Sequence, residues 1–182
     1  MGAIAPRRRV LLLCAAFSRH PEALQWGKEQ AEQAWGPIAL PSELFDHHET
    51  HYYDASMGEG LKKTFWAFER LIDPAELASL KLNTNILEDL YKEVMNHPEQ
   101  RPLNLDPGYL TEAKLVLAST KDRDHRIYLR DGIYAEGTLY FHQGQWKTRP
   151  WTYPDYQRAD YHEFFTRCRE YLRRRYSSPL TP

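Results

Sequence analysis

Short apolar runs along the chain alternate with amphipathic segments, and this pattern predicts strands interleaved with helices. The continuous run Val10 to Phe17 is typical of a strand buried on both faces. Pro21 to Trp35 has helical spacing, and Gly36-Pro37 stops it. Ile38 to Phe45 can form a second strand, and Leu61 to Ile72 mixes β-branched and aromatic residues in a third, so we expect these two strands to pair as a long hairpin.

A second helix begins with a well-marked cap. Asp73 stands at the N-cap, Pro74 follows at the first helical position, and Glu76 lies where a capping-box side chain reaches back to the N-cap N–H. Apolar residues then recur at helical spacing until His97-Pro98 ends the pattern. This segment is predicted to be a helix that faces the core.

The last third of the chain predicts three strands and a helix. In order, these elements are Lys114 to Ser119, Arg126 to Leu129, Ile133 to Phe141 and the helix Tyr156 to Tyr176. Asp131-Gly132 is a hairpin signal between the last two strands, and Gln143-Gly144 predicts a further turn that sends the chain back.

The predicted order of strand, helix, strand, strand, helix, strand matches the ferredoxin-like βαββαβ arrangement. We therefore predict an α+β fold with a mostly antiparallel sheet, extended by a C-terminal β-hairpin and helix. The sequence shows no linker, repeat or low-complexity segment, so residues 1–182 are expected to form a single domain.

The charge balance argues against a general attraction to polyanionic partners. The chain carries 24 Lys and Arg against 25 Asp and Glu, a net charge of −1, so nothing draws it as a whole to nucleic acid or to an anionic membrane. Nucleic acid remains a partner only through a local basic patch, and no run approaches the ~18 apolar residues that span a bilayer. Nothing in the sequence indicates the oligomeric state.

The N-terminus and the cysteines favour a cytoplasmic protein. Arg7-Arg8-Arg9 before an apolar run resembles the start of a secretion signal, but a helical pattern follows at once, and a buried first strand explains the run better. Cys14 and Cys168 have no metal-ligand or redox spacing. We expect both to be free buried thiols in a reducing compartment.

Two segments offer candidate site residues. Asn104 to Tyr109 is predicted to be a tight turn, because Pro107 fixes φ and Gly108 permits positive φ, and such a turn would present Asp106 and Tyr109 beside a pocket. The plain structural interpretation is a turn without a functional role.

The charged run Lys121 to Arg126 is the second candidate. In the functional interpretation Lys121 and Arg126 hold a phosphate or carboxylate, and His125 carries a proton or donates a hydrogen bond. Strand pairing could bring Glu136 beside His125 or Arg126. The alternative is a solvated hairpin tip, the usual fate of such a run.

Other polar stretches carry weaker signals. His47 to His51 (HHETH) contains three histidines, but the spacing lacks the His-Glu-x-x-His helical register, and we predict no dedicated metal site there. Gly58 to Thr64 lacks the spacing of a phosphate loop, although Lys62 and Lys63 could still meet a nucleotide. Asp155 is a candidate N-cap for the last helix, and no cofactor is indicated.

Several runs follow the pattern of one family: Tyr52-Tyr53 with Met57-Gly58, Phe68 to Ile72, Asn104 to Tyr109, His125 to Leu129, Gly132 to Leu139 and Thr152 to Tyr156. On these runs, nearly the whole chain resembles an uncharacterised bacterial and archaeal family, domain of unknown function 4416. The resemblance brings no established activity or catalytic residues. Some members are labelled GTP-binding protein, which implies a nucleotide ligand, although this chain lacks both a phosphate loop and the Asn-Lys-x-Asp guanine motif.

We therefore expect a small anionic ligand, with a nucleotide as one candidate, to bind in a cleft of charged residues at strand ends. The expected lining is Asp106, Tyr109, Lys121, His125, Arg126 and Glu136. A first alternative is a hydrolase or transferase in which His125 acts with Asp106 or Glu136 as an acid–base pair. A second is a protein- or RNA-interaction module that uses the arginine-rich helix between Arg158 and Arg175.

Overall fold

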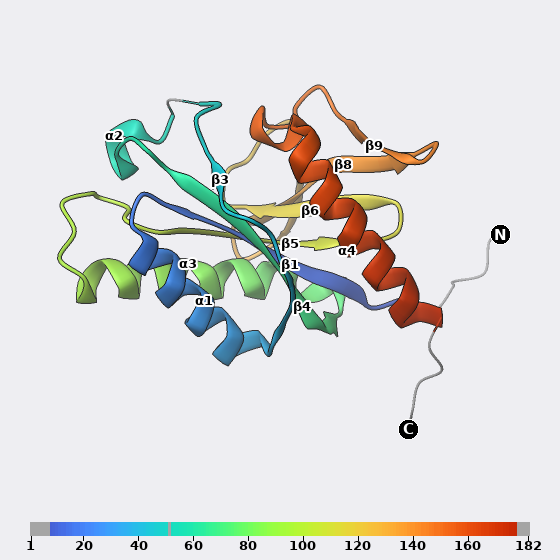
Figure 1. Cartoon of the computed structure of the whole chain (residues 1–182), viewed down its shortest axis with the longest axis horizontal. Coiled ribbons are helices and arrows are strands. Elements are labelled where there is room, and N and C mark those ends of the chain that lie inside the picture. The colour runs from blue at the N-terminus through green and yellow to red at the C-terminus, as the bar shows by residue number, and fades with distance from the viewer. Residues whose placement is uncertain (1–7, 51, 178–182) are drawn as a thin grey trace.

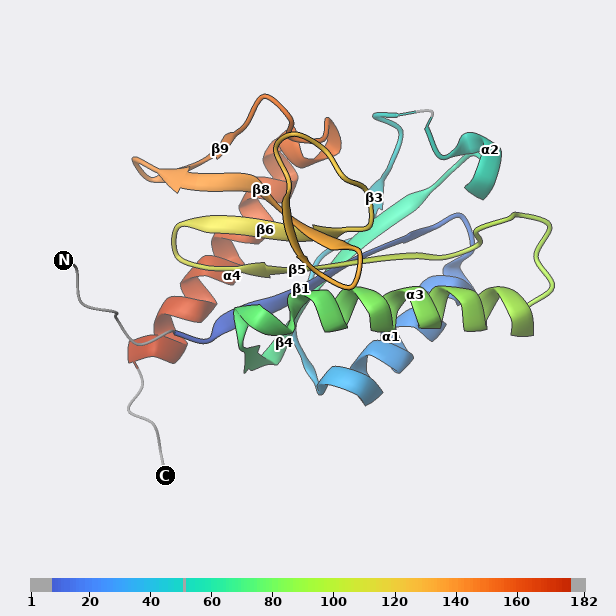
Figure 2. The same cartoon turned by 180° about the vertical axis from the view of Figure 1, so that it is seen from behind.

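A single nine-stranded antiparallel sheet forms the centre of the molecule, as a computed structural model describes it for residues 8–50 and 52–177. The strand order is β2-β4-β1-β5-β6-β8-β7, with β3 beside β4 and β9 beside β8. Helices α1 and α3 cover one face, and α4 crosses the other (Figures 1 and 2). The predicted α+β class is confirmed.

The elements, in chain order, are β1 (Val10–Ser18), α1 (Pro21–Trp35), β2 (Ile38–Pro41), β3 (Phe45–Asp46), α2 (Asp54–Met57), β4 (Lys62–Ile72), η1 (Pro74–Glu76), α3 (Leu77–Val94), β5 (Asn104–Leu110), β6 (Lys114–Ser119), β7 (Ile127–Arg130), β8 (Ile133–His142), β9 (Gln145–Thr148), η2 (Asp155–Gln157) and α4 (Ala159–Ser177).

The ferredoxin-like start is confirmed by the order β2-β4-β1-β5 and by the two crossover helices, α1 and α3, on one face. Strand β1 lies between β4 and β5 and is buried along its whole length. Leu11 and Leu13 point toward α4, and Leu12 and Cys14 point toward α1 and α3. This alternation explains the continuous apolar run, because both faces of the strand meet a helical layer.

The predicted helix cap is also confirmed. Asp73 accepts a hydrogen bond from the Ala75 N–H at 2.8 Å, and Glu76 accepts one from the Asp73 N–H at 2.9 Å. This capping box opens η1, which leads directly into α3. The stripe of α4 that includes Phe164, Phe165 and Leu172 is buried against the sheet, as its spacing predicts.

The prediction of a tight turn at Asn104–Tyr109 was wrong, because this segment is strand β5. Strand β5 pairs with β1 from Asn104 onward, but it pairs with β6 only from Gly108 to Leu110. Pro107 thus lies just before the β5–β6 ladder begins, where its missing N–H removes no bond to β6. A Cβ at Gly108 would lie 2.5 Å from the Val116 carbonyl oxygen, so glycine permits the close approach of the two strands.

The C-terminal hairpins follow their predicted turns. Asp131 and Gly132 have φ values of 54° and 75°, and Gln143 and Gly144 have 49° and 77°. Two consecutive residues with positive φ are the signature of a type I′ hairpin turn. The first turn joins β7 to β8, and the second returns the chain as β9.

Candidate functional site

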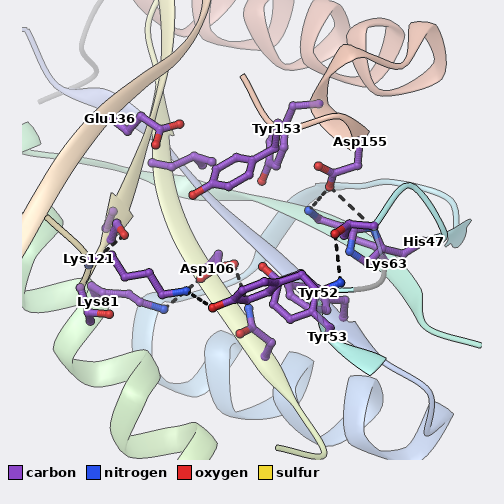
Figure 3. Close-up of a pocket in the computed structure, with 18 of the residues that line it drawn as sticks. His47, Tyr52, Tyr53, Lys63, Lys81, Asp106, Lys121, Glu136, Tyr153 and Asp155 are labelled. Carbon is purple, nitrogen blue, oxygen red and sulfur yellow. Dashed lines mark hydrogen bonds and ion pairs between the residues drawn. The ribbon is translucent and has the colours of Figure 1, made fainter. Parts of the chain in front are cut away.

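A cavity of about 510 Å³ opens where β6 diverges from β5 (Figure 3). Side chains of α3, on one face of the sheet, and of the segment before α4, on the other, both line it. The part of β5 without a β6 partner therefore leaves a gap that both helical layers border. Its volume is of the order found in pockets for small ligands. We call it the charged cavity.

Six cations and four carboxylates from the described residues line the charged cavity. They are Lys63, Lys81, Arg101, Lys121, Arg123, Arg126, Glu88, Asp106, Glu136 and Asp155. When all are ionised, the wall carries an excess of two positive charges. Each carboxylate lies close to a cation of its own, and these pairs determine which charges remain for a ligand.

The first pair joins Lys81 of α3 to Asp106 of β5. The Lys81 ammonium donates to Asp106 Oδ1 and to the Leu105 carbonyl, each at 3.0 Å, and Asn104 donates to Asp106 Oδ2 at 2.8 Å. Burial works against the Asp106 carboxylate, but the Lys81 charge and hydrogen bond outweigh it and hold the pKa of Asp106 below its ordinary value. Burial also opposes the Lys81 ammonium, yet its pKa is raised by the charges of Asp106 and Glu88.

Glu88 lies two turns further along α3 and is less well compensated. Burial raises its pKa to about 7, against the smaller opposing influence of Lys81, whose Nζ lies 3.9 Å from Glu88 Oε1. The Leu105 N–H donates to Oε1 at 2.7 Å, and Arg101 Nη2 lies 3.6 Å from Oε2. The charge on this wall of the cavity therefore depends on pH near neutrality.

His47, Lys63 and Asp155 form a second group, which we call the His47 cluster. Lys63 Nζ donates to Asp155 Oδ2 at 2.6 Å, and both side chains are buried. Asp155 opens η2 rather than capping α4, so its predicted N-cap role was wrong. Its carboxylate instead neutralises a lysine that strand β4 carries into the interior.

The His47 imidazole is the least satisfied member of this cluster. Neither ring nitrogen has a hydrogen-bond partner among the described residues, although the side chain is only 2% exposed. Nδ1 lies 3.7 Å from Asp155 Oδ2 and 3.6 Å from Glu49 Oε2, which is too far for a hydrogen bond. Burial, followed by the Lys63 charge, lowers the pKa of His47 below its ordinary value and so favours the neutral ring.

Glu136 stands at the centre of a third group, the Glu136 network, with Arg126, His125 and Thr138. Its Oε2 accepts from Arg126 Nε at 2.8 Å and lies 3.2 Å from His125 Nε2, while Thr138 Oγ1 donates to Oε1 at 3.2 Å. Arg126 also donates to Ser119 Oγ, to the Lys121 carbonyl and to Tyr153 Oη. The Arg126 guanidinium therefore already donates its hydrogen bonds to acceptors within the protein.

Lys121 and Arg123 occupy the mouth of the charged cavity. Lys121 Nζ donates to Tyr52 Oη at 2.5 Å and lies 4.5 Å from the centre of that ring. In the part of the chain that the structure describes, neither Lys121 nor Arg123 forms an ion pair with a carboxylate. These exposed cations are the positive charges that no carboxylate neutralises.

Four of the six residues expected at the site line one cavity: Asp106, Lys121, Arg126 and Glu136. His125 does not line it, because its ring stacks on Trp151 at 5.0 Å beside Glu136. Tyr109 lies elsewhere, packed against the apolar residues under α3, so the expectation that it shares this lining was wrong.

The sequence did not predict His47, Lys81, Arg101 or Asp155 as residues of this site, and it offered Lys63 only as a residue that could meet a nucleotide. A usable signal was present in α3, where Lys81 and Glu88 interrupt an apolar helical stripe. A buried lysine on such a stripe requires a buried partner. No comparable signal marked His47, because polar neighbours surround it in the sequence.

In the segment His47 to His51, residue 51 lies outside the described residues. His48 is exposed, and neither His47 nor His48 belongs to a metal-compatible group among residues 8–50 and 52–177.

The arginines of α4 make contacts within the protein. Arg169 lies over the Phe141 ring and donates to the Glu112 carbonyl at 2.7 Å. Arg175 donates to the Glu69 carbonyl at 3.0 Å. None of the helices in the described ranges is long and apolar enough to cross a membrane.

Comparison with known sequences and structures adds one match. A family model described as "Domain of unknown function (DUF4416)" matches residues 8–171. Neither the curated proteins nor the solved structures contain a significant match to this chain. The matched region includes every residue that lines the charged cavity.

Proposed function

The chain belongs to the DUF4416 family, and for this member we propose that the charged cavity binds a small anionic ligand of the nucleotide class. The observation that carries the proposal is the uneven pairing of charges. Each of the four carboxylates lies beside a cation of the wall, whereas Lys121 and Arg123 at the mouth have no carboxylate partner among the described residues. A phosphate placed there would meet ammonium and guanidinium donors.

The aromatic lining favours a nucleotide over a simple inorganic anion. Tyr52, Tyr53, Tyr153 and Tyr156 line the same cavity as the mouth cations. Tyrosine rings offer stacking surfaces to a nucleobase, and their hydroxyl groups can donate to its polar edge. The bound ligand would direct its phosphates toward Lys121 and Arg123 and its base toward the tyrosines.

A thermal-shift and calorimetric screen of the full chain tests this proposal. The probes are inorganic phosphate, pyrophosphate, GTP, ATP, sugar phosphates and dicarboxylates, because a ligand that binds only the native state raises Tm by mass action. We expect nucleotides to stabilise most. Lys121→Ala combined with Arg123→Ala should weaken their binding at least tenfold, since each lost charged hydrogen bond contributes about 1.5–3 kcal/mol.

Lys114→Ala is the matched control for the mouth lysine. Lys114 is exposed at the other end of strand β6 and does not line the charged cavity. This variant should leave ligand affinity unchanged. Equal binding by the wild type and the Lys121→Ala/Arg123→Ala variant would overturn the proposal, as would the absence of stabilisation by every phosphorylated probe.

Acid–base catalysis on the bound ligand is a second candidate function, and His47 favours it. Its buried imidazole lines the cavity, has no hydrogen-bond partner among the described residues, and has a carboxylate 3.7 Å away. His125 is within reach of Glu136 but lies outside the lining. If stabilising nucleotides are turned over, phosphorus NMR should show product with the wild type and none with His47→Gln. Equal turnover by both would exclude His47.

We also propose a cytoplasmic location. Cys14 and Cys168 are buried free thiols: Cys14 lies on β1 and faces α1 and α3, and Cys168 lies on α4 and faces the opposite side of the sheet. Unpaired buried cysteines are compatible with a reducing compartment.

A further inference from the structure

A second group of chemically reactive side chains lies outside the charged cavity, where the chain enters α1 and leaves α3. His20 is the N-cap residue of α1, Glu22 lies in its first turn, and His97 follows the end of α3. One ligand atom from each of the three residues lies within 4.8 Å of the others. The start of α1 and the end of α3 lie side by side in both views (Figures 1 and 2).

The spacing within this group suits a metal ion. His20 Nδ1 lies 3.6 Å from Glu22 Oε1, and the rings of His20 and His97 are 4.0 Å apart at their centres. In a tetrahedral site with bonds of about 2.0–2.1 Å, neighbouring ligand atoms are about 3.3 Å apart. The three ligand atoms lie within 4.8 Å of one another, so the exposed or half-buried side chains would rotate to bring them to that spacing.

Each imidazole is also oriented by a partner on one ring nitrogen. His20 Nε2 lies 2.9 Å from Glu99 Oε2, and His97 Nε2 lies 3.0 Å from Tyr91 Oη. Arg19 in turn donates to Glu99 at 3.2 Å. A carboxylate, backbone carbonyl or water on the far nitrogen usually orients a histidine that binds a metal through its other nitrogen. Glu99 takes this place at His20, and the Tyr91 hydroxyl takes it at His97. These contacts are a second observation, independent of the spacing.

We propose that His20, Glu22 and His97 bind a divalent transition-metal ion of the zinc class. Two imidazoles and one carboxylate favour zinc, cobalt or nickel over magnesium or calcium, which prefer oxygen ligands. Three protein ligands leave one tetrahedral position for water. None of the three residues lines the charged cavity, so the metal site is separate from the proposed nucleotide site.

The position of the site indicates what the ion stabilises. It joins the start of α1 to the segment that follows α3, and four residues after His97 that segment reaches Arg101. Arg101 lines the charged cavity and hydrogen-bonds to Asn104. A bound metal therefore fixes the base of the segment that carries a cavity arginine.

Metal titration of the full-length, tag-free chain tests the proposal. Protein treated with a chelator and dialysed is titrated with Zn²⁺ by calorimetry and with Co²⁺ by visible absorption. We expect one ion per chain at this site, with tetrahedral cobalt bands. His20→Ala and His97→Ala should each weaken binding at least tenfold, and Tyr91→Phe or Glu99→Gln should weaken it about 10–100-fold through loss of orientation.

Glu22→Gln keeps the test decisive if a histidine variant folds poorly, because Glu22 is an exposed residue on the first turn of α1. It should remove the cobalt bands while leaving the melting curve of the metal-free protein and its nucleotide binding unchanged. His142→Ala is the control for loss of an exposed imidazole elsewhere.

Unchanged metal affinity in Glu22→Gln and in the His20→Ala/His97→Ala double variant would overturn the proposal. Loss of binding in His48→Ala would also overturn it, because the ion would then belong to the segment His47 to His51.

Discussion

The Glu136 network and the His47 cluster are two buried polar groups around one cavity, and they differ in how completely they are satisfied. Both side-chain oxygens of Glu136 have partners, and Arg126 makes four hydrogen bonds within the protein. In the His47 cluster, Asp155 accepts from Lys63, but both nitrogens of the His47 ring lack a partner among the residues described.

This difference in hydrogen bonding distinguishes a polar group that stabilises the fold from one that is available to a ligand. A buried polar group with all its partners stabilises one arrangement of the chain, whereas an orphaned one costs free energy unless something else bonds to it. Through Arg126, the Glu136 network links β8 to the turn before β7 and to Tyr153 in the segment before α4. We therefore assign it a structural role and place the chemistry at His47 and at the mouth cations.

The largest effect is expected from removing the cation of the Glu136 network. The Arg126 and Glu136 side chains are 5% and 2% exposed, so Arg126→Met leaves a buried carboxylate without its guanidinium. The free energy of unfolding should fall by about 3–5 kcal/mol. Urea denaturation at pH 7 measures it.

Two variants sharpen this first prediction. Arg123→Met, which removes an exposed guanidinium from the same turn, should change stability by no more than about 0.5 kcal/mol. Adding Glu136→Gln to Arg126→Met should recover part of the loss, because the buried charge is gone. If Arg126→Met is as stable as Arg123→Met, the network is not structural and the comparison fails.

Glu88 is less completely satisfied than Glu136 and more completely satisfied than His47. It accepts a hydrogen bond from the Leu105 N–H, but its charge is incompletely compensated. Its pKa of about 7 in the folded protein lies above the value in an unfolded chain, so folding takes up a proton between about pH 4.5 and 7. The stabilisation that protonation of Glu88 provides is fully present below about pH 4.5 and is lost as the pH rises through 7.

Glu88→Gln should therefore change the free energy of unfolding more favourably at pH 8 than at pH 5. The difference between the two changes should be on the order of 2 kcal/mol. The glutamine oxygen can still accept from the Leu105 N–H. Urea unfolding of both proteins from pH 5 to pH 8 gives the two curves. Parallel curves would mean that Glu88 ionises normally and that the cavity wall keeps a constant charge.

The fold could be predicted well because its signals are local. The buried run of β1, the capping box at Asp73 and the two positive-φ turns each follow from a few adjacent residues. The failure at Asn104–Tyr109 has a clear cause: Pro107 and Gly108 signal a turn locally, but here they mark the point where one strand diverges from its neighbour. That role depends on the pairing of strands.

The candidate site was predictable only where its residues are close in sequence. The run Lys121 to Arg126 was identified as charged, but which of its cations is free depends on Glu136 and Tyr153, which tertiary contacts bring to Arg126. Lys63 and Asp155 are 92 residues apart and meet only in the folded chain. Sequence composition cannot distinguish a satisfied arginine from an unsatisfied one.

The smallest effect, and the most diagnostic, is expected at His47. The centre of its ring lies 5.2 Å from that of Phe17 and 5.9 Å from that of Tyr53, so two aromatic rings pack against it. His47→Leu removes two buried nitrogens that have no partner among the described residues, so the free energy of unfolding should stay the same or rise by about 1 kcal/mol. Nucleotide-induced stabilisation should decrease, because the ligand loses a polar contact.

A gain in stability together with a loss of binding is typical of a functional residue, since stability is commonly sacrificed where a site must stay unsatisfied until its ligand arrives. The matched variant is His125→Leu, which takes a partnered imidazole from the Glu136 network and should lower stability without reducing nucleotide binding. If His47→Leu is instead the destabilising variant, then the His47 ring is structural like that of His125, and the distinction between the two polar groups is lost.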